Sequence, residues 1–132
     1  MKYLLDTDWV IDHIRNLERV VQRVKELTPE GLALSVISLA ELYEGVLNST
    51  DPVSNEQTLQ EFVSDIELVP IDEETYRIFG RERERMRRAR RMIAEFDLLT
   101  DSTCLRHNLT LLSKNRRHFK SVEGLEIISI SR

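Results

Sequence analysis

The apolar run that decides the fold is closed by a carboxylate and reads Met1-Lys2-Tyr3-Leu4-Leu5-Asp6. The run is short and contains no turn residue, which predicts a buried β-strand. A second run of the same kind lies at Leu32–Ile37. Apolar residues recur at helical spacing after each run. Strands that alternate with helices predict an α/β domain with a mainly parallel sheet.

The other elements are predicted from the same signals. Strands are expected at 68–71, 109–113 and 125–130, and Pro70 places the first of these at a sheet edge. Thr7 or Asp8 is expected to cap the first helix and Ser38 the third, with Asn108 as the C-cap of the last. The predicted helices span about 8–14, 20–27, 39–47, 52–65, 72–91 and 95–107.

Length and composition limit the class of protein. The 132 residues, 41% of them hydrophobic, fit one domain with a buried core and argue against disorder. No apolar run approaches the roughly 18 residues of a membrane span, and no secretory signal is visible. Cys104 is the only cysteine, which favours a reducing cytoplasm. The net charge of -4 argues, at first sight, against a nucleic-acid partner.

Carboxylates follow the predicted strands where a functional site is expected. In parallel α/β sheets the functional crevice lies beyond the carboxyl ends of the strands. That rule selects Asp6, the Ser38–Glu41 segment and the Ser113–Asn115 segment, and Asp97 opens a nearby helix. Converging carboxylates repel each other unless a cation is bound, and oxygen ligands suit Mg²⁺ or Mn²⁺. Helix capping or surface exposure would explain each acid equally well.

Four short motifs, in this order, resemble those of the PIN-domain family, and of its VapC-type toxin ribonucleases in particular. Together they cover nearly the whole chain. The motifs are Leu4-Leu5-Asp6-Thr7-Asp8; Ser35-Val36-Ile37-Ser38-Leu39-Ala40-Glu41-Leu42; Phe96-Asp97-Leu98-Leu99 with Ser102-Thr103; and Leu111-Leu112-Ser113-Lys114-Asn115-Arg116-Arg117-His118-Phe119 with Val122-Glu123-Gly124-Leu125.

The resemblance implies a Mg²⁺- or Mn²⁺-dependent endoribonuclease with a three-layer α/β/α fold and a five-stranded, mainly parallel sheet. It carries over Asp6, Glu41 and Asp97 as catalytic, metal-binding carboxylates. Asn115 stands where a fourth acid is frequent in the family, and it would contribute only a neutral carbonyl or a water contact. The resemblance also implies a homodimer and a VapB-like antitoxin as partners of a cytoplasmic protein.

Some residues depart from the family pattern or have two interpretations. Thr100 and Asp101 replace the small apolar residues usual after the third acid. Asp101 lies one helical turn after Asp97, so it is either an additional metal ligand or a solvated helix residue. The hydroxyls of Thr7 and Ser38 either support the acids or cap helices.

A strongly basic segment reverses the first conclusion from net charge. Residues 77–91 hold eight arginines and two glutamates, a net +6, so the remainder of the chain carries -10. Arginine binds phosphates in bidentate fashion, although a solvated helix with internal ion pairs is the alternative. The candidate contacts to RNA or to an acidic antitoxin segment are Arg87, Arg88, Arg90, Arg91, Lys114, Arg116 and Arg117.

Two other functions remain open at this point. A catalytically weak or inactive PIN-like module would bind RNA or protein, and Asn115 favours it. A receiver- or phosphatase-like domain would use Asp6 as a nucleophile, although the order of helices fits it poorly. The scattered histidines and Cys104 are predicted to have no catalytic role.

Overall fold

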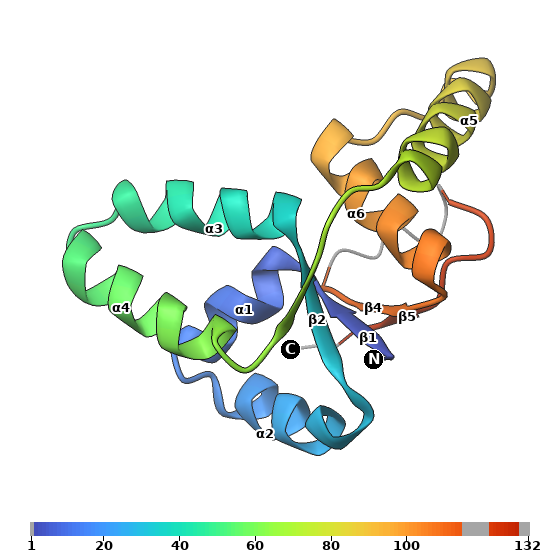
Figure 1. Cartoon of the computed structure of the whole chain (residues 1–132). Coiled ribbons are helices and arrows are strands. Elements are labelled where there is room, and N and C mark those ends of the chain that lie inside the picture. The colour runs from blue at the N-terminus through green and yellow to red at the C-terminus, as the bar shows by residue number, and fades with distance from the viewer. Residues whose placement is uncertain (1, 115–121, 130–132) are drawn as a thin grey trace.

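The computed structural model describes residues 2–114 and 122–129, and within them helices and strands alternate as predicted (Figure 1). In chain order the elements are β1 (Tyr3–Leu5), α1 (Thr7–Ile14), α2 (Glu18–Leu27), a 3₁₀ turn η1 (Thr28–Glu30), β2 (Leu32–Ser35), α3 (Val36–Leu47), α4 (Pro52–Val63), β3 (Glu67–Val69), α5 (Glu73–Ala89), α6 (Glu95–His107), β4 (Thr110–Leu112) and β5 (Ile127–Ile128).

The strands form one five-stranded sheet in the order β3-β2-β1-β4-β5, and every pair is parallel. The register pairs Leu4 with Ala33 on one side of β1 and with Leu111 on the other. Strand β3 lies at the edge, as Pro70 predicted. Since all strands run the same way, the carboxyl ends of β1, β2 and β4 meet side by side at one edge.

Helices cover both faces of the sheet, which confirms the three-layer α/β/α architecture. Alternate strand residues face opposite sides: Leu5 and Leu34 pack with α1 to α4, whereas Leu4 and Leu111 pack with α5 and α6. Figure 1 shows α1 to α4 gathered on one side and α5 with α6 on the other. Cys104 is buried in the second core, as expected for a cysteine without a catalytic role.

Two predicted helix caps are wrong, and the second strand, β2, ends at Ser35, before its apolar run does. Asp6, rather than Thr7 or Asp8, is the N-cap of α1. Ser35, rather than Ser38, is the N-cap of α3, and its hydroxyl accepts the Ser38 amide at 3.0 Å. The apolar run up to Ile37 continues as the first turn of α3, since the cap and the packing of α3 override the β-propensity of its branched side chains.

The arginine-rich helix is shorter than predicted and carries many internal ion pairs. Asp72 caps α5 and Arg90 ends it in the left-handed conformation, with φ of 57°. Glu84 pairs with both Arg87 and Arg88, at 3.5 Å and 3.1 Å. Within the described part of the chain, no helix is both long and apolar enough to cross a membrane.

Candidate functional site

Asp6 lies at the carboxyl end of β1, next to β4. Its Oδ1 accepts the Thr7 amide at 2.8 Å, and its own amide donates to the Leu112 carbonyl at 2.9 Å. The Ser113 hydroxyl donates to Asp6 Oδ2 at 2.6 Å. Asp6 is only 8% exposed. These bonds fix a carboxylate where β1 and β4 end, as the strand-end rule predicted.

Glu41 and Asp97 reach the same edge from two helices. Glu41 lies in the second turn of α3, and its Oε1 accepts a hydrogen bond from the Thr7 hydroxyl at 3.2 Å. Partial burial raises the pKa of Glu41, and the charges of Asp6 and Asp97 raise it further. Asp97 lies in the first turn of α6 but does not cap it, since Ala94 is the N-cap. The charges of Asp6 and Asp97 therefore both act on Glu41.

A further carboxylate, Asp8, belongs to the same cluster. Its Oδ2 accepts the Lys114 amide at 3.0 Å and the Ser113 hydroxyl at 3.4 Å. Burial, and then the charge of Asp6, raises the pKa of Asp8 to about 6. A carboxylate whose ionisation is opposed by burial and by a neighbouring acid is relieved by a bound cation.

The donor set fits a hard divalent cation, although no compact cage is preformed. Oxygen donors converge, and Asp8 Oδ1 is buried without a hydrogen bond from any described residue. No three acidic, histidine or cysteine side chains of residues 2–114 and 122–129 are placed to hold an ion together. Mg²⁺ is usually held by one or two carboxylates and keeps several waters, so a dispersed carboxylate set is compatible with it.

The other predicted site residues are placed as follows. The Ser38 hydroxyl accepts a hydrogen bond from Ser35 at 3.2 Å and is buried. Asp101 is fully buried, and its charge contributes to the raised pKa of Cys104. Lys114 Nζ lies 2.7 Å from Asp12 Oδ2. Asn115, Arg116 and Arg117 lie outside the described residues.

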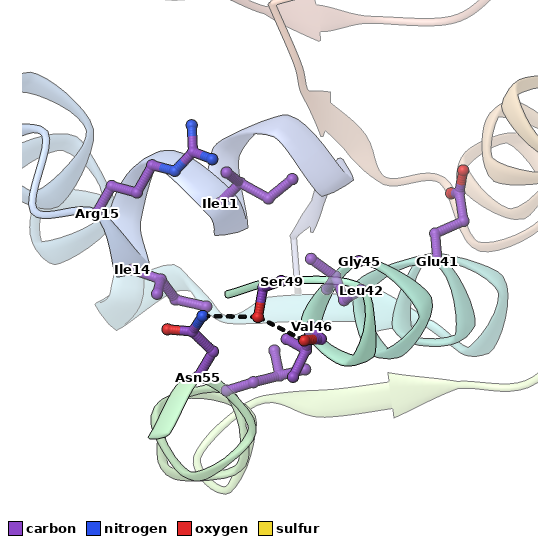
Figure 2. A pocket seen from close by; sticks show the side chains of 10 residues that line it. Ile11, Ile14, Arg15, Glu41, Leu42, Gly45, Val46, Ser49 and Asn55 are labelled. Carbon is purple, nitrogen blue, oxygen red and sulfur yellow. Dashed lines mark hydrogen bonds between the residues drawn. The ribbon is translucent and has the colours of Figure 1, made fainter. Parts of the chain in front are cut away.

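An apolar groove of about 220 Å³ runs beside this cluster, between α1, α3 and α4. Figure 2 shows Glu41 towards one end of it and Ser49 and Asn55 at the other, where the Asn55 amide donates to the Ser49 hydroxyl at 2.9 Å. Its wall includes Ile11, Ile14, Leu42, Gly45, Val46 and Leu59. The groove thus leads from an apolar surface to a candidate catalytic carboxylate.

A family model of the PIN domain matches residues 3–125 of the chain. The chain belongs to the PIN domain family. The family resemblance of the four sequence motifs is therefore confirmed. The strand order and the helix layers described above are this chain's version of the PIN fold.

Known PIN-domain relatives match the chain over nearly its full length. Ribonuclease VapC1 of Methanocaldococcus jannaschii is 30% identical, with 96% of this chain and 86% of that protein covered. The tRNA(fMet)-specific endonuclease VapC of Shigella flexneri is 28% identical, with 95% of each chain covered. The chain is therefore a VapC-type member of the PIN family.

Solved structures agree with this assignment. A chain in the crystal structure of VapBC2 from Rickettsia felis, bound to a DNA fragment from their promoter, superposes with a TM-score of 0.92. It is 26% identical, and 99% of this chain and 100% of that chain are covered. The fold and the family of this protein are thus supported by sequence and by structure.

Asp8, Asp12 and Ser113 are the residues of this PIN site that sequence reasoning missed or placed only within a segment. Asp8 was considered as a helix cap, yet it lies two residues after Asp6 at a strand end. Asp12 lies one turn further along α1 and therefore on the same face. The spacing Asp6-x-Asp8-x₃-Asp12 was thus the signal that could have located a second row of acids.

The raised pKa of Asp8 predicts how the stability of the metal-free PIN domain depends on pH. Its folded pKa of about 6 exceeds the ordinary value of 3.8. The folded state therefore binds the proton more tightly, and the free energy of unfolding should fall as pH rises from about 4 to about 6. Urea unfolding in EDTA at several pH values measures this free energy, and the Asp8→Asn variant should show a weaker dependence on pH. A free energy of unfolding that rises with pH over the same range in the wild-type protein would contradict the prediction.

Proposed function

We propose that this protein is a divalent-metal-dependent endoribonuclease, the toxin of a VapBC-type toxin–antitoxin pair, which hydrolyses RNA phosphodiester bonds. The observation that carries the proposal is that Asp6, which follows β1, and Asp97 of α6 both act electrostatically on Glu41 of α3, at the carboxyl edge of a PIN fold. It favours the nuclease over an inactive binding module, because a scaffold has no need for a carboxylate, Asp6, whose charge raises the pKa of both Glu41 and Asp8.

In the proposed mechanism, Asp6, Glu41 and Asp97 would hold Mg²⁺ or Mn²⁺, and Asp101 and Asn115 are further candidate ligands. The chemistry supplied by a bound divalent ion is polarisation of a phosphate oxygen and activation of water. The chain itself orients the ligands. The Thr7 hydroxyl holds Glu41 and the Ser113 hydroxyl holds Asp6, each by donating a hydrogen bond. A hydroxyl that donates to a carboxylate in this way fixes the direction in which the carboxylate presents its free oxygen.

A cleavage assay with metal titration tests the proposal. Purified protein is incubated with total cellular RNA after EDTA treatment, and Mg²⁺ or Mn²⁺ is then added back. Cleavage that appears only with added metal, at discrete sites, supports a nuclease, and mapping the ends identifies the target. RNA binding without cleavage at any metal concentration would instead support the scaffold function.

The partner that we propose is a VapB-like antitoxin that binds the apolar groove. The helices α3 and α4, which border the groove, also carry exposed apolar side chains, since Leu47 is 65% and Val53 is 82% exposed. Its end at Glu41 would accept a basic side chain, so an antitoxin segment with apolar residues and one cation would fit. We also propose a homodimer that acts in the cytoplasm.

Arg90 and Arg91 are the arginines that we expect to contact RNA most directly. In the described part of the chain neither takes part in an ion pair, whereas Arg87 and Arg88 share Glu84. Both lie between α5 and α6, and the first turn of α6 carries Asp97. The variant Arg90→Glu/Arg91→Glu should bind single-stranded RNA about tenfold more weakly, with a salt slope shallower by about 1.4. Binding measured at several salt concentrations checks this.

The matched control is Arg77→Glu/Arg81→Glu, in the amino-terminal half of α5. Both arginines pair with acids of the first turn of α5. We expect a smaller effect from this control. Equal losses from the two variants would mean that RNA senses only the overall charge of α5.

A further inference from the structure

Two acids of α1 contact the two residues that follow β4. Asp8 and Asp12 are four residues apart and therefore lie on one face of the helix. Asp8 accepts the amide of Lys114, and Asp12 pairs with the ammonium group of the same residue. Lys114 is thus bound to α1 through both its backbone and its side chain.

The Asp12–Lys114 ion pair is more buried than an exposed ion pair of α5. The Asp12 side chain is 5% exposed and that of Lys114 is 29% exposed, and their atoms approach to 2.7 Å. A pair such as Arg77–Glu73 on α5 is mostly in water, with both side chains more than half exposed. A buried carboxylate needs its counter-charge, so breaking a buried pair is far more disruptive than breaking an exposed one. The ammonium group of Lys114 is therefore committed to Asp12.

The position of Lys114 determines the position of Ser113. The Ser113 amide donates to the Ile128 carbonyl at 3.1 Å, which ties this residue to β5. Its hydroxyl then bridges the two acids of the site, at 2.6 Å from Asp6 and 3.4 Å from Asp8. A shift of the segment after β4 would move this hydroxyl away from Asp6.

We infer that Asp12 and Lys114 are a positioning pair, which fixes the end of β4 against α1 so that the Ser113 hydroxyl orients the carboxylate of Asp6. The inference rests on the proposed function, because it treats Asp6 as a metal ligand. It assigns to Lys114 a role other than contact with RNA phosphate. Neither residue of the pair touches the substrate or the ion.

The test uses Asp12→Asn, Lys114→Met and Lys114→Arg in the full chain. Loss of a residue that orients a metal ligand typically weakens metal binding by about 10- to 100-fold. We therefore expect Asp12→Asn and Lys114→Met to raise the Mn²⁺ dissociation constant by that factor, measured by calorimetry without RNA. At subsaturating metal kcat falls, while KM for RNA is unchanged. Lys114→Arg keeps the cation and should retain most of the metal affinity.

The matched control is Arg106→Met, which removes an ion pair to Asp72 far from the site. It should lower the melting temperature without changing the affinity for Mn²⁺. The inference is overturned if the two test variants behave like this control. It is also overturned if Lys114→Met raises KM for RNA and flattens its salt dependence while Asp12→Asn does neither, which would make Lys114 a phosphate contact. A wild-type protein that neither binds Mn²⁺ nor cleaves RNA refutes the proposed function itself, before any variant is compared.

Discussion

Asp6→Asn is expected to reduce metal-dependent RNA cleavage by about a thousandfold or more, since loss of a charged metal ligand removes several kcal/mol of transition-state stabilisation. The substitution removes the charge of Asp6 but keeps its role as the N-cap of α1. Asparagine is as good an N-cap as aspartate, so α1 keeps its cap and the fold should be retained. Initial rates at saturating metal, with thermal unfolding of the same samples, measure both effects.

Asp51→Asn is the matched control, because Asp51 also caps a helix, α4, and accepts the Ser54 amide away from the carboxylate cluster. It should cleave RNA at the wild-type rate. A second readout reports on the cluster directly, since removing the Asp6 charge should lower the pKa of Asp8 from about 6. Wild-type cleavage by Asp6→Asn would show that this carboxylate is not part of the catalytic site.

Gly45→Phe is expected to weaken binding of the cognate antitoxin by about 30-fold or more, the loss that follows when a hot-spot contact of about 2 kcal/mol is blocked. Gly45 lies in the wall of the apolar groove, and a Cβ at this position meets no atom within 4 Å. The added ring therefore occupies the groove without disturbing the core. Replacing glycine inside a helix also removes a penalty of several tenths of a kcal/mol, so stability should not fall. Titration of labelled antitoxin measures the affinity.

Gly80→Phe provides the control in α5. A Cβ at Gly80 likewise meets no atom within 4 Å, but this glycine borders Arg81, Glu84, Arg85 and Arg88 instead of the groove. Full antitoxin affinity is expected for it. If Gly80→Phe weakens binding and Gly45→Phe does not, the antitoxin binds the arginine-rich helix and the groove proposal fails.

The sheet and its layers were predictable because buried parallel strands and amphipathic helices leave strong periodic signals. Leu4, Leu5 and Leu34 are apolar without interruption, as two-sided burial requires. The helix starts were less predictable. The strand signal of Val36 and Ile37 did not reveal that the Ser35 hydroxyl would cap a helix at once, because a cap depends on where the backbone turns.

The acids of the site show the same difference between what the local sequence reveals and what the folded chain decides. Asp6 was located by its place at the end of a strand, and Glu41 and Asp97 by family motifs. The ion pair of Asp12 with Lys114 joins positions more than a hundred residues apart in sequence, and no local pattern encodes it. The arginine surplus of 77–91 was visible in sequence, yet which arginines Glu84 neutralises depended on side-chain geometry.

By itself, the sequence determined the class of fold, the positions of the strands and the candidate carboxylates, because apolar periodicity and acid placement are local properties of the chain. Only the tertiary structure decided that Asp8 joins the carboxylate cluster, that Lys114 is bound to Asp12 and that a groove leads to Glu41. The physical reason is that burial and charge interaction depend on distances across the sheet. These distances arise only when β1 and β4 lie side by side.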